Sequence, residues 1–288
     1  MINKFIKDFE AHIKEENINV YRMAVVRRGE EPIVREYKVC NPCQNSYSVT
    51  KAFTLTAIGM LYDEGKIDMQ AKVCDILRKF CDETTDPRWS DVTVEQVILH
   101  HTGLPSAFLD IDYNSVYDYG EDFLAACLRY PIEPTEERVY ADANFYILSR
   151  IFEAVAGMPV DEFFWKRMFF KMRFSEAGFS KCPQGHPLGA TGLYIRTEDM
   201  LKLGELYLCG GVWRGERILS EEWVRMVQER KYLPPIKGTT AYGHAGMRGQ
   251  MLMIIPDSHC AVAWHGYHSS DLRGWVCDYF ININNKEI

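Results

Sequence analysis

Apolar residues recur at helical spacing at the start of the chain and change to strand spacing soon after it. Charged residues separate the apolar positions of the first stretch, which predicts an amphipathic helix. These positions are Ile2, Phe5, Ile6, Phe9 and Ile13. Segments 19–28 and 32–39 are rich in β-branched residues and flank a turn signal at Gly29. This pattern predicts a β-hairpin.

The middle of the chain has the pattern of successive helices. Residues 48–64 form a mostly apolar helical stretch that ends at Gly65, a residue suited to a helix C-terminus. Asp142 stands where a helix N-cap would, and Thr197 and Ser220 are further expected caps. The other predicted helices span 93–101, 121–130, 143–156, 160–172, 197–209 and 220–230.

The chain returns to strands near its end. Strands are predicted at 250–255 and 260–264, around a turn at Pro256, and a last helix at 271–280. The order predicts an α/β (α+β) fold, in which one antiparallel sheet is flanked by N- and C-terminal helices and an all-helical lobe is inserted. We expect a discontinuous sheet lobe of residues 1–65 and 185–288, a helical lobe of residues 66–184, and an active site at their interface.

Charge and composition exclude several classes of function. The net charge of −7, with no basic cluster, argues against a nucleic-acid partner. No apolar run reaches the roughly 18 residues of a membrane span, and the N-terminus lacks a signal-peptide pattern. The nine cysteines fit reduced thiols, so we expect a cytoplasmic protein. The pair Cys40 and Cys43 admits a metal or redox role, but small core residues are the favoured interpretation.

Ser48 and Lys51 are the first candidates for chemistry. Positions i and i+3 of a helix share one side, so the Lys51 amine can reach the Ser48 hydroxyl. A serine needs an adjacent base, and lysine can serve only when burial disfavours its charged form. The alternatives are a helix-capping serine and a surface lysine. The apolar neighbours of Lys51 argue against the second.

Six segments in order give this chain a family resemblance. Three are Ser48-Val-Thr-Lys51, Tyr140-Ala-Asp142 and His244-Ala-Gly246, and the others are 99–105, 192–199 and 210–215. Together they resemble the serine β-lactamase and penicillin-binding-protein superfamily, most closely its class C β-lactamase branch. The resemblance implies a serine hydrolase that acts through an acyl-enzyme on a small ester, amide or peptide, without a metal or cofactor.

The resemblance also implies roles for particular residues. Ser48 would be the nucleophile and either Lys51 or Tyr140 the general base, although Tyr140 could also be a packing tyrosine. The Met247 N–H would be a second oxyanion donor. The residues expected to bind substrate are Asp142, His244, Gly246, Met247 and Arg248. His265, His268 and Arg273 are further possible anchors for a substrate carboxylate, although an ordinary surface or packing residue is the favoured interpretation of each.

Two departures from the family pattern bear on the substrate. Asp142 replaces a common asparagine, and an ionised carboxylate cannot donate a hydrogen bond. His244 opens a motif that in the antibiotic-degrading enzymes begins with lysine. Both favour an esterase or peptidase over a β-lactamase. A weak β-lactamase or penicillin-binding protein stays an alternative, as does a catalytically silent member with a binding or regulatory role.

An acidic loop is a candidate calcium-binding site. Oxygen-bearing side chains occur there at the spacing of a calcium loop, although Ser115 replaces the glycine that allows the sharp turn. A solvated acidic loop is the competing interpretation. The residues concerned are Asp110, Asp112, Asn114, Asp118 and Glu121.

Overall fold

The computed structural model describes residues 1–236 and 238–284, which form two compact units. The sheet unit comprises Met1–Ala52, Met172–Ala177 and Tyr194–Ile288. The helical unit comprises Phe53–Lys171 and Gly178–Leu193. The first boundary lies inside helix α2 (Thr50–Asp63), whereas the sequence pattern placed it after residue 65.

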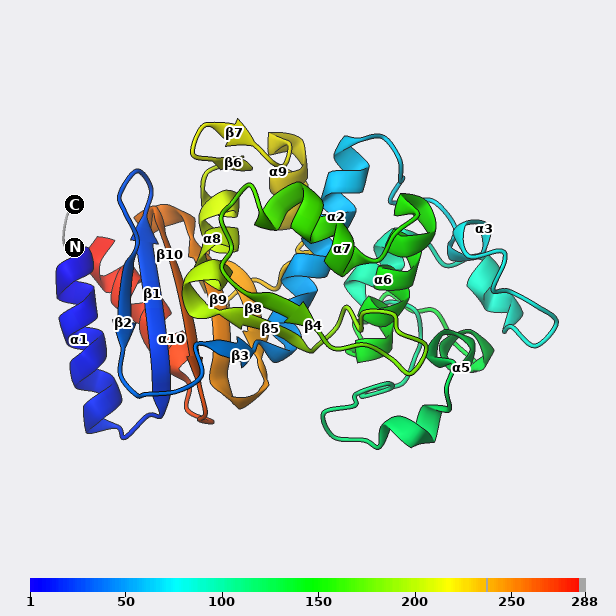
Figure 1. Cartoon of the computed structure of the whole chain (residues 1–288), viewed down its shortest axis with the longest axis horizontal. Coiled ribbons are helices and arrows are strands. Elements are labelled where there is room, and N and C mark those ends of the chain that lie inside the picture. Colours follow the sequence, from blue (N-terminus) through cyan, green and yellow to red (C-terminus); the bar gives the residue numbers. More distant parts are fainter. Residues whose placement is uncertain (237, 285–288) are drawn as a thin grey trace. The chain divides into compact units, whose positions relative to one another are not determined.

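A five-stranded antiparallel sheet is the centre of the sheet unit. Its strand order is β2-β1-β10-β9-β8, so strands from both ends of the chain lie side by side (Figure 1). The strands are β1 (Val20–Arg27), β2 (Ile33–Glu36), β8 (Tyr242–Gly246), β9 (Gln250–Ile255) and β10 (Cys260–Gly266). The predicted antiparallel sheet of terminal strands is confirmed.

Alternation along the strands gives the sheet two different faces. One face packs against α1 (Ile2–Glu15) and α10 (Leu272–Asn284) through a large aromatic and aliphatic core. The other face packs against α8 (Thr197–Leu208). Alanines line that second face, and a Cβ on Gly204 of α8 would lie 3.1 Å from the Cβ of Ala261. Small residues therefore allow α8 to approach the sheet closely.

Shorter elements complete the sheet unit. Strand β3 (Cys43–Asn45) pairs with β5 (Leu193–Arg196), a pairing that the sequence pattern did not predict. Ser220 caps α9 as predicted, accepting a hydrogen bond from the Trp223 N–H at 2.9 Å. Arg196, not Thr197, is the N-cap of α8. The remaining elements are η1 (Tyr47–Val49), β6 (Val212–Trp213), β7 (Glu216–Arg217), α9 (Glu221–Glu229), η5 (Met247–Gly249) and η6 (Pro256–Ser258).

Helix α6 (Asp142–Ala156) is the centre of the helical unit. Its residues 142–152 are all buried, and it contacts α3 (Val73–Ile76), α4 (Val94–Leu99), α5 (Phe123–Arg129) and α7 (Val160–Phe164). A helix that is covered on nearly every side can position polar groups with little freedom. The unit also contains η2 (Pro87–Ser90), η3 (Val116–Tyr119) and the π-helical turn η4 (Trp165–Phe169), and β4 (Ala177–Phe179) lies at its boundary.

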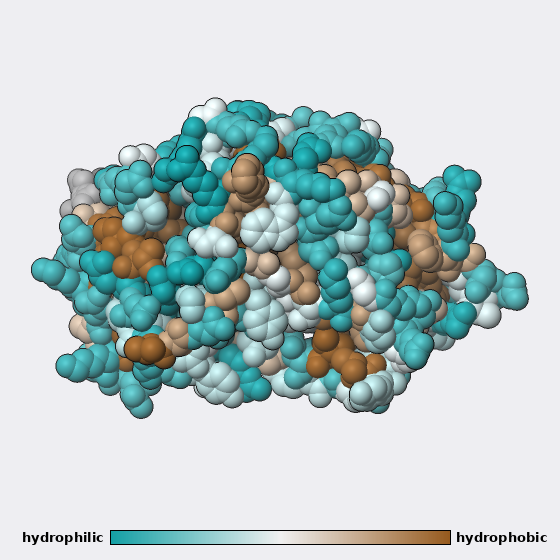
Figure 2. Space-filling view, viewed as in Figure 1, coloured by the Kyte–Doolittle hydropathy of each residue, from teal (hydrophilic) through white to brown (hydrophobic). Residues whose placement is uncertain are grey.

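The face of the molecule in Figure 2 is mostly hydrophilic, and its hydrophobic residues form small separate patches. Scattered apolar residues are normal on a folded surface, so these patches carry no functional argument. Within the described residues, no helix is both long and apolar enough to cross a membrane.

Candidate active site

Ser48 lies in the short helical turn η1, immediately ahead of α2. The sequence pattern placed it on the α-helix itself, and that detail is wrong. The reason lies one residue earlier, because Tyr47 has a φ of 47°, in the left-handed region. Such a conformation costs free energy in a non-glycine residue and occurs often at functional sites. Tyr47 redirects the chain, so that a 3₁₀ turn carries Ser48 before the α-helix begins.

Lys51 is fully buried in the first turn of α2, and its Nζ lies 3.0 Å from Ser48 Oγ. The separation of three residues places the two side chains together, as the helical spacing predicts. Ser48 itself is half-buried. The arrangement places a hydroxyl at hydrogen-bond distance from a fully buried amine, and burial by itself disfavours the charged form of an amine.

Strand β8 packs against the turn that carries Ser48. A Cβ on Gly246 would lie 2.3 Å from the backbone oxygen of Ser46, which no real side chain tolerates. Glycine at this position therefore lets the strand reach the serine-bearing turn. This close approach explains why the last residue of the His244-Ala-Gly246 segment is a glycine.

His244 is buried within β8, with 7% of its surface exposed. Its Nδ1 lies 2.8 Å from the backbone oxygen of Ala245. A carbonyl oxygen can only accept, so Nδ1 carries the proton in that contact. In the neutral ring Nε2 is then a hydrogen-bond acceptor, which differs from the obligate donor that a lysine would offer at this position.

Met247 and Arg248 follow β8 in the turn η5. Gln250 holds this turn, because its Nε2 donates to the backbone oxygen of Arg248 at 3.2 Å and to that of Gly266 at 2.7 Å. Arg248 has a φ of 63°, and its guanidinium lies 5.1 Å from the ring centroid of Tyr267. The sequence pattern did not reveal Gln250 as the residue that fixes the turn.

Tyr140 stands two residues before α6, in the helical unit. The imidazole of His100 stacks on its ring, with centroids 4.9 Å apart and an interplanar angle of 26°. The guanidinium of Arg138 lies 5.3 Å from the same ring. Two neighbours from different segments therefore hold the orientation of the phenol.

A buried network continues from His100 into α6. The Ala141 N–H donates to His100 Nδ1 at 3.3 Å, and Asn144 Nδ2 lies 3.2 Å from the same nitrogen. Thr102 Oγ1 donates to Asn144 Oδ1 at 2.7 Å. A backbone N–H can only donate, so Nδ1 is unprotonated and His100 is the Nε2–H tautomer. The sequence singled out the segment Leu99–Pro105 only for its family resemblance, and it revealed neither this network nor the contact of His100 with Tyr140.

Asp142 is the first residue of α6, and Ala141 is the N-cap, so the expected capping role of Asp142 is wrong. The carboxylate of Asp142 is buried, and its oxygens lie within 4.8 Å of those of Asp110 and Asp112. Thr191 Oγ1 donates to Asp112 at 2.6 Å. The predicted acidic loop thus converges with the residue that replaces the family asparagine. Among the described residues, Asp118 and Glu121 do not belong to this group.

His265 fits the favoured interpretation of a packing residue and not the alternative of an anchor for a carboxylate. It is 1% exposed, and burial lowers the pKa of its imidazole to about 3. Thr197 Oγ1 lies 2.7 Å from its Nδ1. Burial also lowers the pKa of His268. A buried neutral ring cannot attract a carboxylate, so His265 is a residue of the core.

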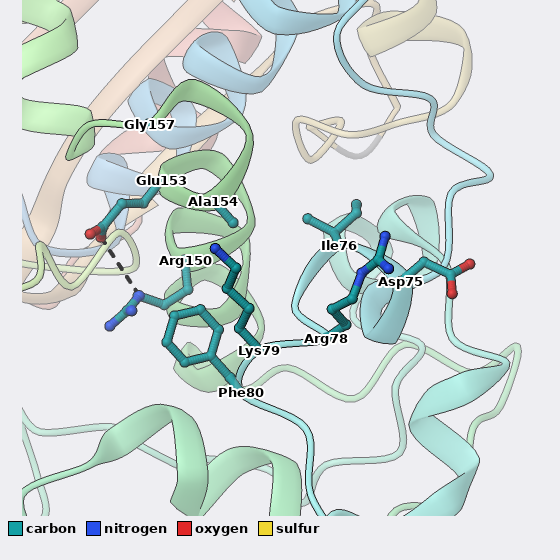
Figure 3. A pocket seen from close by; sticks show the side chains of 9 residues that line it. All are labelled: Asp75, Ile76, Arg78, Lys79, Phe80, Arg150, Glu153, Ala154 and Gly157. Carbon is teal, nitrogen blue, oxygen red and sulfur yellow. Dashed lines mark ion pairs between the residues drawn. The ribbon is translucent and has the colours of Figure 1, made fainter.

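A cavity of about 400 Å³ lies in the helical unit, and Figure 3 shows the side chains that line it. Residues of α6 form one side of it and residues around α3 the other. Its lining contains none of the sequence-predicted site residues. The lining residues are Asp75, Ile76, Arg78, Lys79, Phe80, Arg150, Glu153, Ala154 and Gly157.

The structure therefore groups the predicted site residues into two sets. The sheet unit holds Ser48 and Lys51 in contact, with β8 and its His244 and Gly246 against the same turn. The helical unit holds Tyr140 on His100 and Asp142 beside two further carboxylates. The approach of Tyr140 to Ser48 stays a prediction.

Comparison with known proteins decides the family. The sequence model described as Beta-lactamase matches residues 43–267, most of the chain and all three motif segments. The chain belongs to the Beta-lactamase family. The superfamily resemblance stated from the motifs is thereby confirmed, and so is the β-lactamase-like fold, whereas the class C branch stays a prediction.

Curated relatives of this Beta-lactamase family chain carry hydrolase names. The 6-aminohexanoate-dimer hydrolase of Paenarthrobacter ureafaciens is 22% identical over 77% of this chain and 60% of its own length. A putative D-alanyl-D-alanine carboxypeptidase of Escherichia coli K12 is 22% identical over 87% of this chain and 76% of its own length. The chain thus spans three fifths of the first relative.

A solved structure with the same fold is the putative 6-aminohexanoate-dimer hydrolase from Bacillus anthracis. It matches with a TM-score of 0.78 at 16% identity, over 95% of this chain and 81% of its own. At this identity the likeness shows the fold alone.

Proposed function

We propose that this protein is a serine hydrolase that forms an acyl-enzyme at Ser48. The observation that carries the proposal is the 3.0 Å contact between Ser48 Oγ and the fully buried Nζ of Lys51. A serine hydroxyl becomes a nucleophile when a base takes its proton as it attacks. Burial favours the neutral amine, which is the form that can take it.

The proposed reaction has two steps. Ser48 Oγ attacks the substrate carbonyl carbon while its proton passes to Lys51 or Tyr140, and the tetrahedral oxyanion collapses with loss of the alcohol or amine. Water then attacks the acyl-serine and releases the acid. The Ser48 and Met247 N–H groups are the proposed oxyanion donors. Tyr140 is proposed to share the proton transfers, held in orientation by His100.

We infer that the substrate is a small ester, amide or peptide. Asp142 stands where the family commonly has an amide donor, and a carboxylate lacks that donor. His244 offers an acceptor at Nε2 in the neutral ring. Both features favour an esterase or peptidase over a β-lactamase. The names of the curated relatives, a 6-aminohexanoate-dimer hydrolase and a putative D-alanyl-D-alanine carboxypeptidase, support amide cleavage as one candidate.

A substrate screen tests the proposal. Wild type and Ser48→Ala are compared on p-nitrophenyl esters of increasing acyl length, on matched anilides, on D-amino-acid peptides and on a chromogenic cephalosporin. We expect turnover of short esters or amides that Ser48→Ala abolishes, with little or no cephalosporin cleavage. Binding of these compounds without any turnover by wild type would instead support a catalytically silent family member.

A further inference from the structure

We propose that Cys74 and Cys81 are a covalent modification site that closes reversibly into an intramolecular disulfide. Their Sγ atoms lie 3.4 Å apart, and both side chains are half-buried, so a small reagent can reach them. A disulfide bond is about 2.05 Å long, so the sulfurs need to approach by roughly 1.4 Å.

The local fold brings the two cysteines together. Cys74 lies in α3, and the buried side chains of Val73 and Leu77 fix that helix on the core. The Phe80 N–H then donates to the backbone oxygen of Leu77 at 2.8 Å, which closes a turn and returns the chain toward Cys74. The α3 end of the segment is therefore anchored, and the turn brings the Cys81 sulfur to that of Cys74 before any bond forms.

No other pair of cysteines has such a contact in the part of the chain that the structure describes. The spacing of Cys40 and Cys43 is the more conspicuous motif, but no sulfur–sulfur contact joins them within that part. The structure thus selects a pair that the sequence motif does not.

The chemistry assigns different tasks to the two sulfurs. Burial raises the pKa of the Cys74 thiol, so we assign the first attack to Cys81. The Cys81 thiolate attacks one sulfur of a small disulfide such as oxidised glutathione and releases one glutathione thiolate. Cys74 then attacks the Cys81 sulfur, and its proton goes to the second departing thiolate. Two protein thiols are oxidised and one small disulfide is reduced.

The bond would act on the cavity of Figure 3. Asp75, Ile76, Arg78, Lys79 and Phe80 lie between the two cysteines and form one side of that cavity. The ring of Phe80 also lies over the guanidinium of the buried Arg150, 5.2 Å from its Cζ. A covalent link between the ends of the segment removes conformations in which this wall moves away from α6.

Peptide mapping tests the proposal. Fully reduced protein is incubated with oxidised glutathione, remaining thiols are alkylated, and the protein is digested with trypsin without reduction. We expect a disulfide-linked pair of peptides 73–78 and 80–88, with the other seven of the nine cysteines alkylated, and its disappearance on reduction. Alkylation of both residues, separate glutathione adducts on each, or a Cys40–Cys43 link instead would overturn the proposal.

Matched variants separate the roles of the two thiols. Cys74→Ser should stop at a stable glutathione adduct on Cys81, because no second thiol resolves it. Cys81→Ser should leave Cys74 available for alkylation. Cys40→Ser is the control and should give the same linked peptides as wild type. The mapping of wild type alone decides the proposal if a variant does not fold, which circular dichroism reports.

Discussion

The imidazole of His100 stacks on the ring of Tyr140 at 4.9 Å and accepts a hydrogen bond from the N–H of Ala141, the next residue. One side chain thus holds both the ring and the backbone of the motif segment. His100→Ala removes the stacking surface and leaves a buried N–H without its acceptor, which costs about 1–3 kcal/mol of stability.

We expect His100→Ala to lower kcat by about 10²-fold, because a small displacement of a catalytic group has effects of that size. KM should change less, since His100 is not proposed to touch substrate. Steady-state kinetics and thermal unfolding measure the two effects. The neighbouring His101→Ala is the control, and an equal loss of kcat there would refute a specific positioning role for His100.

Lys51 tests the identity of the base. General-base catalysis contributes about 10²–10⁴-fold. Lys51→Ala should therefore lower turnover by at least that factor, and Lys51→Arg should not restore it, because a guanidinium does not release its proton. Lys66→Arg, at an exposed position, is the control. Full activity in Lys51→Arg would show that Lys51 supplies only charge and that Tyr140 is the base.

Gly246→Ala tests the packing of β8 on the turn that carries Ser48. The new Cβ would lie 2.3 Å from the Ser46 backbone oxygen, so the strand must move. Overpacking of this kind costs about 1–3 kcal/mol. We expect lower stability in urea and a large loss of kcat. Gly178→Ala, where a Cβ meets no atom within 4 Å, should leave both unchanged.

Asp142→Asn tests the departure from the family pattern. The substitution restores a side-chain donor and removes one of three neighbouring carboxylates. We expect ester turnover to persist and the ratio of amide to ester kcat/KM to rise. Asp118→Asn, in the exposed part of the same loop, is the control. A complete loss of ester turnover in a folded Asp142→Asn protein would contradict this account.

The buried His265 predicts a specific pH dependence of stability. Its pKa is lowered to about 3 in the folded protein, against about 6.5 when unfolded, so the unfolded state binds the proton first as pH falls. The contribution of His265 to the free energy of unfolding is fully present above pH 6.5 and is lost as the pH falls from 6.5 to 3. From pH 7 to pH 5 the loss is about 2 kcal/mol.

His265→Gln should show a correspondingly smaller loss between these two pH values in chemical denaturation. The comparison between wild type and variant cancels the titration of the other groups. Equal pH dependence of the two proteins would mean that His265 accepts a proton in the folded state.

The sheet and the longer helices could be predicted from the sequence because their apolar periodicity is strong. Helix α1 and strands β1, β9 and β10 lie where the pattern placed them. The strand pair β3 and β5 was missed because it is short, and β3 has no buried residue. Periodicity reports burial, and a half-buried strand of three residues leaves little signal.

The contacts of the candidate site also divide into those that the sequence predicts and those that it does not. The contact of Ser48 with Lys51 follows from helical spacing, which is local. The left-handed Tyr47, the stacking of His100 on Tyr140 and the convergence of Asp110 with Asp142 depend on tertiary structure. Contacts between residues far apart in sequence leave no periodic trace in one chain. The contact of Cys74 with Cys81 is closer in sequence but depends on the turn that closes at Phe80.

The identity of the nucleophile is the central claim, and covalent labelling tests it most directly. Wild type and Ser48→Ala are incubated with a fluorophosphonate and, separately, with a labelled penicillin. Their intact masses are measured before and after labelling, and tryptic mapping locates any adduct. We expect one fluorophosphonate adduct on wild type, located at Ser48, and none on Ser48→Ala. An unmodified wild type under conditions that label a known serine hydrolase, or an adduct that persists in Ser48→Ala, would contradict the account.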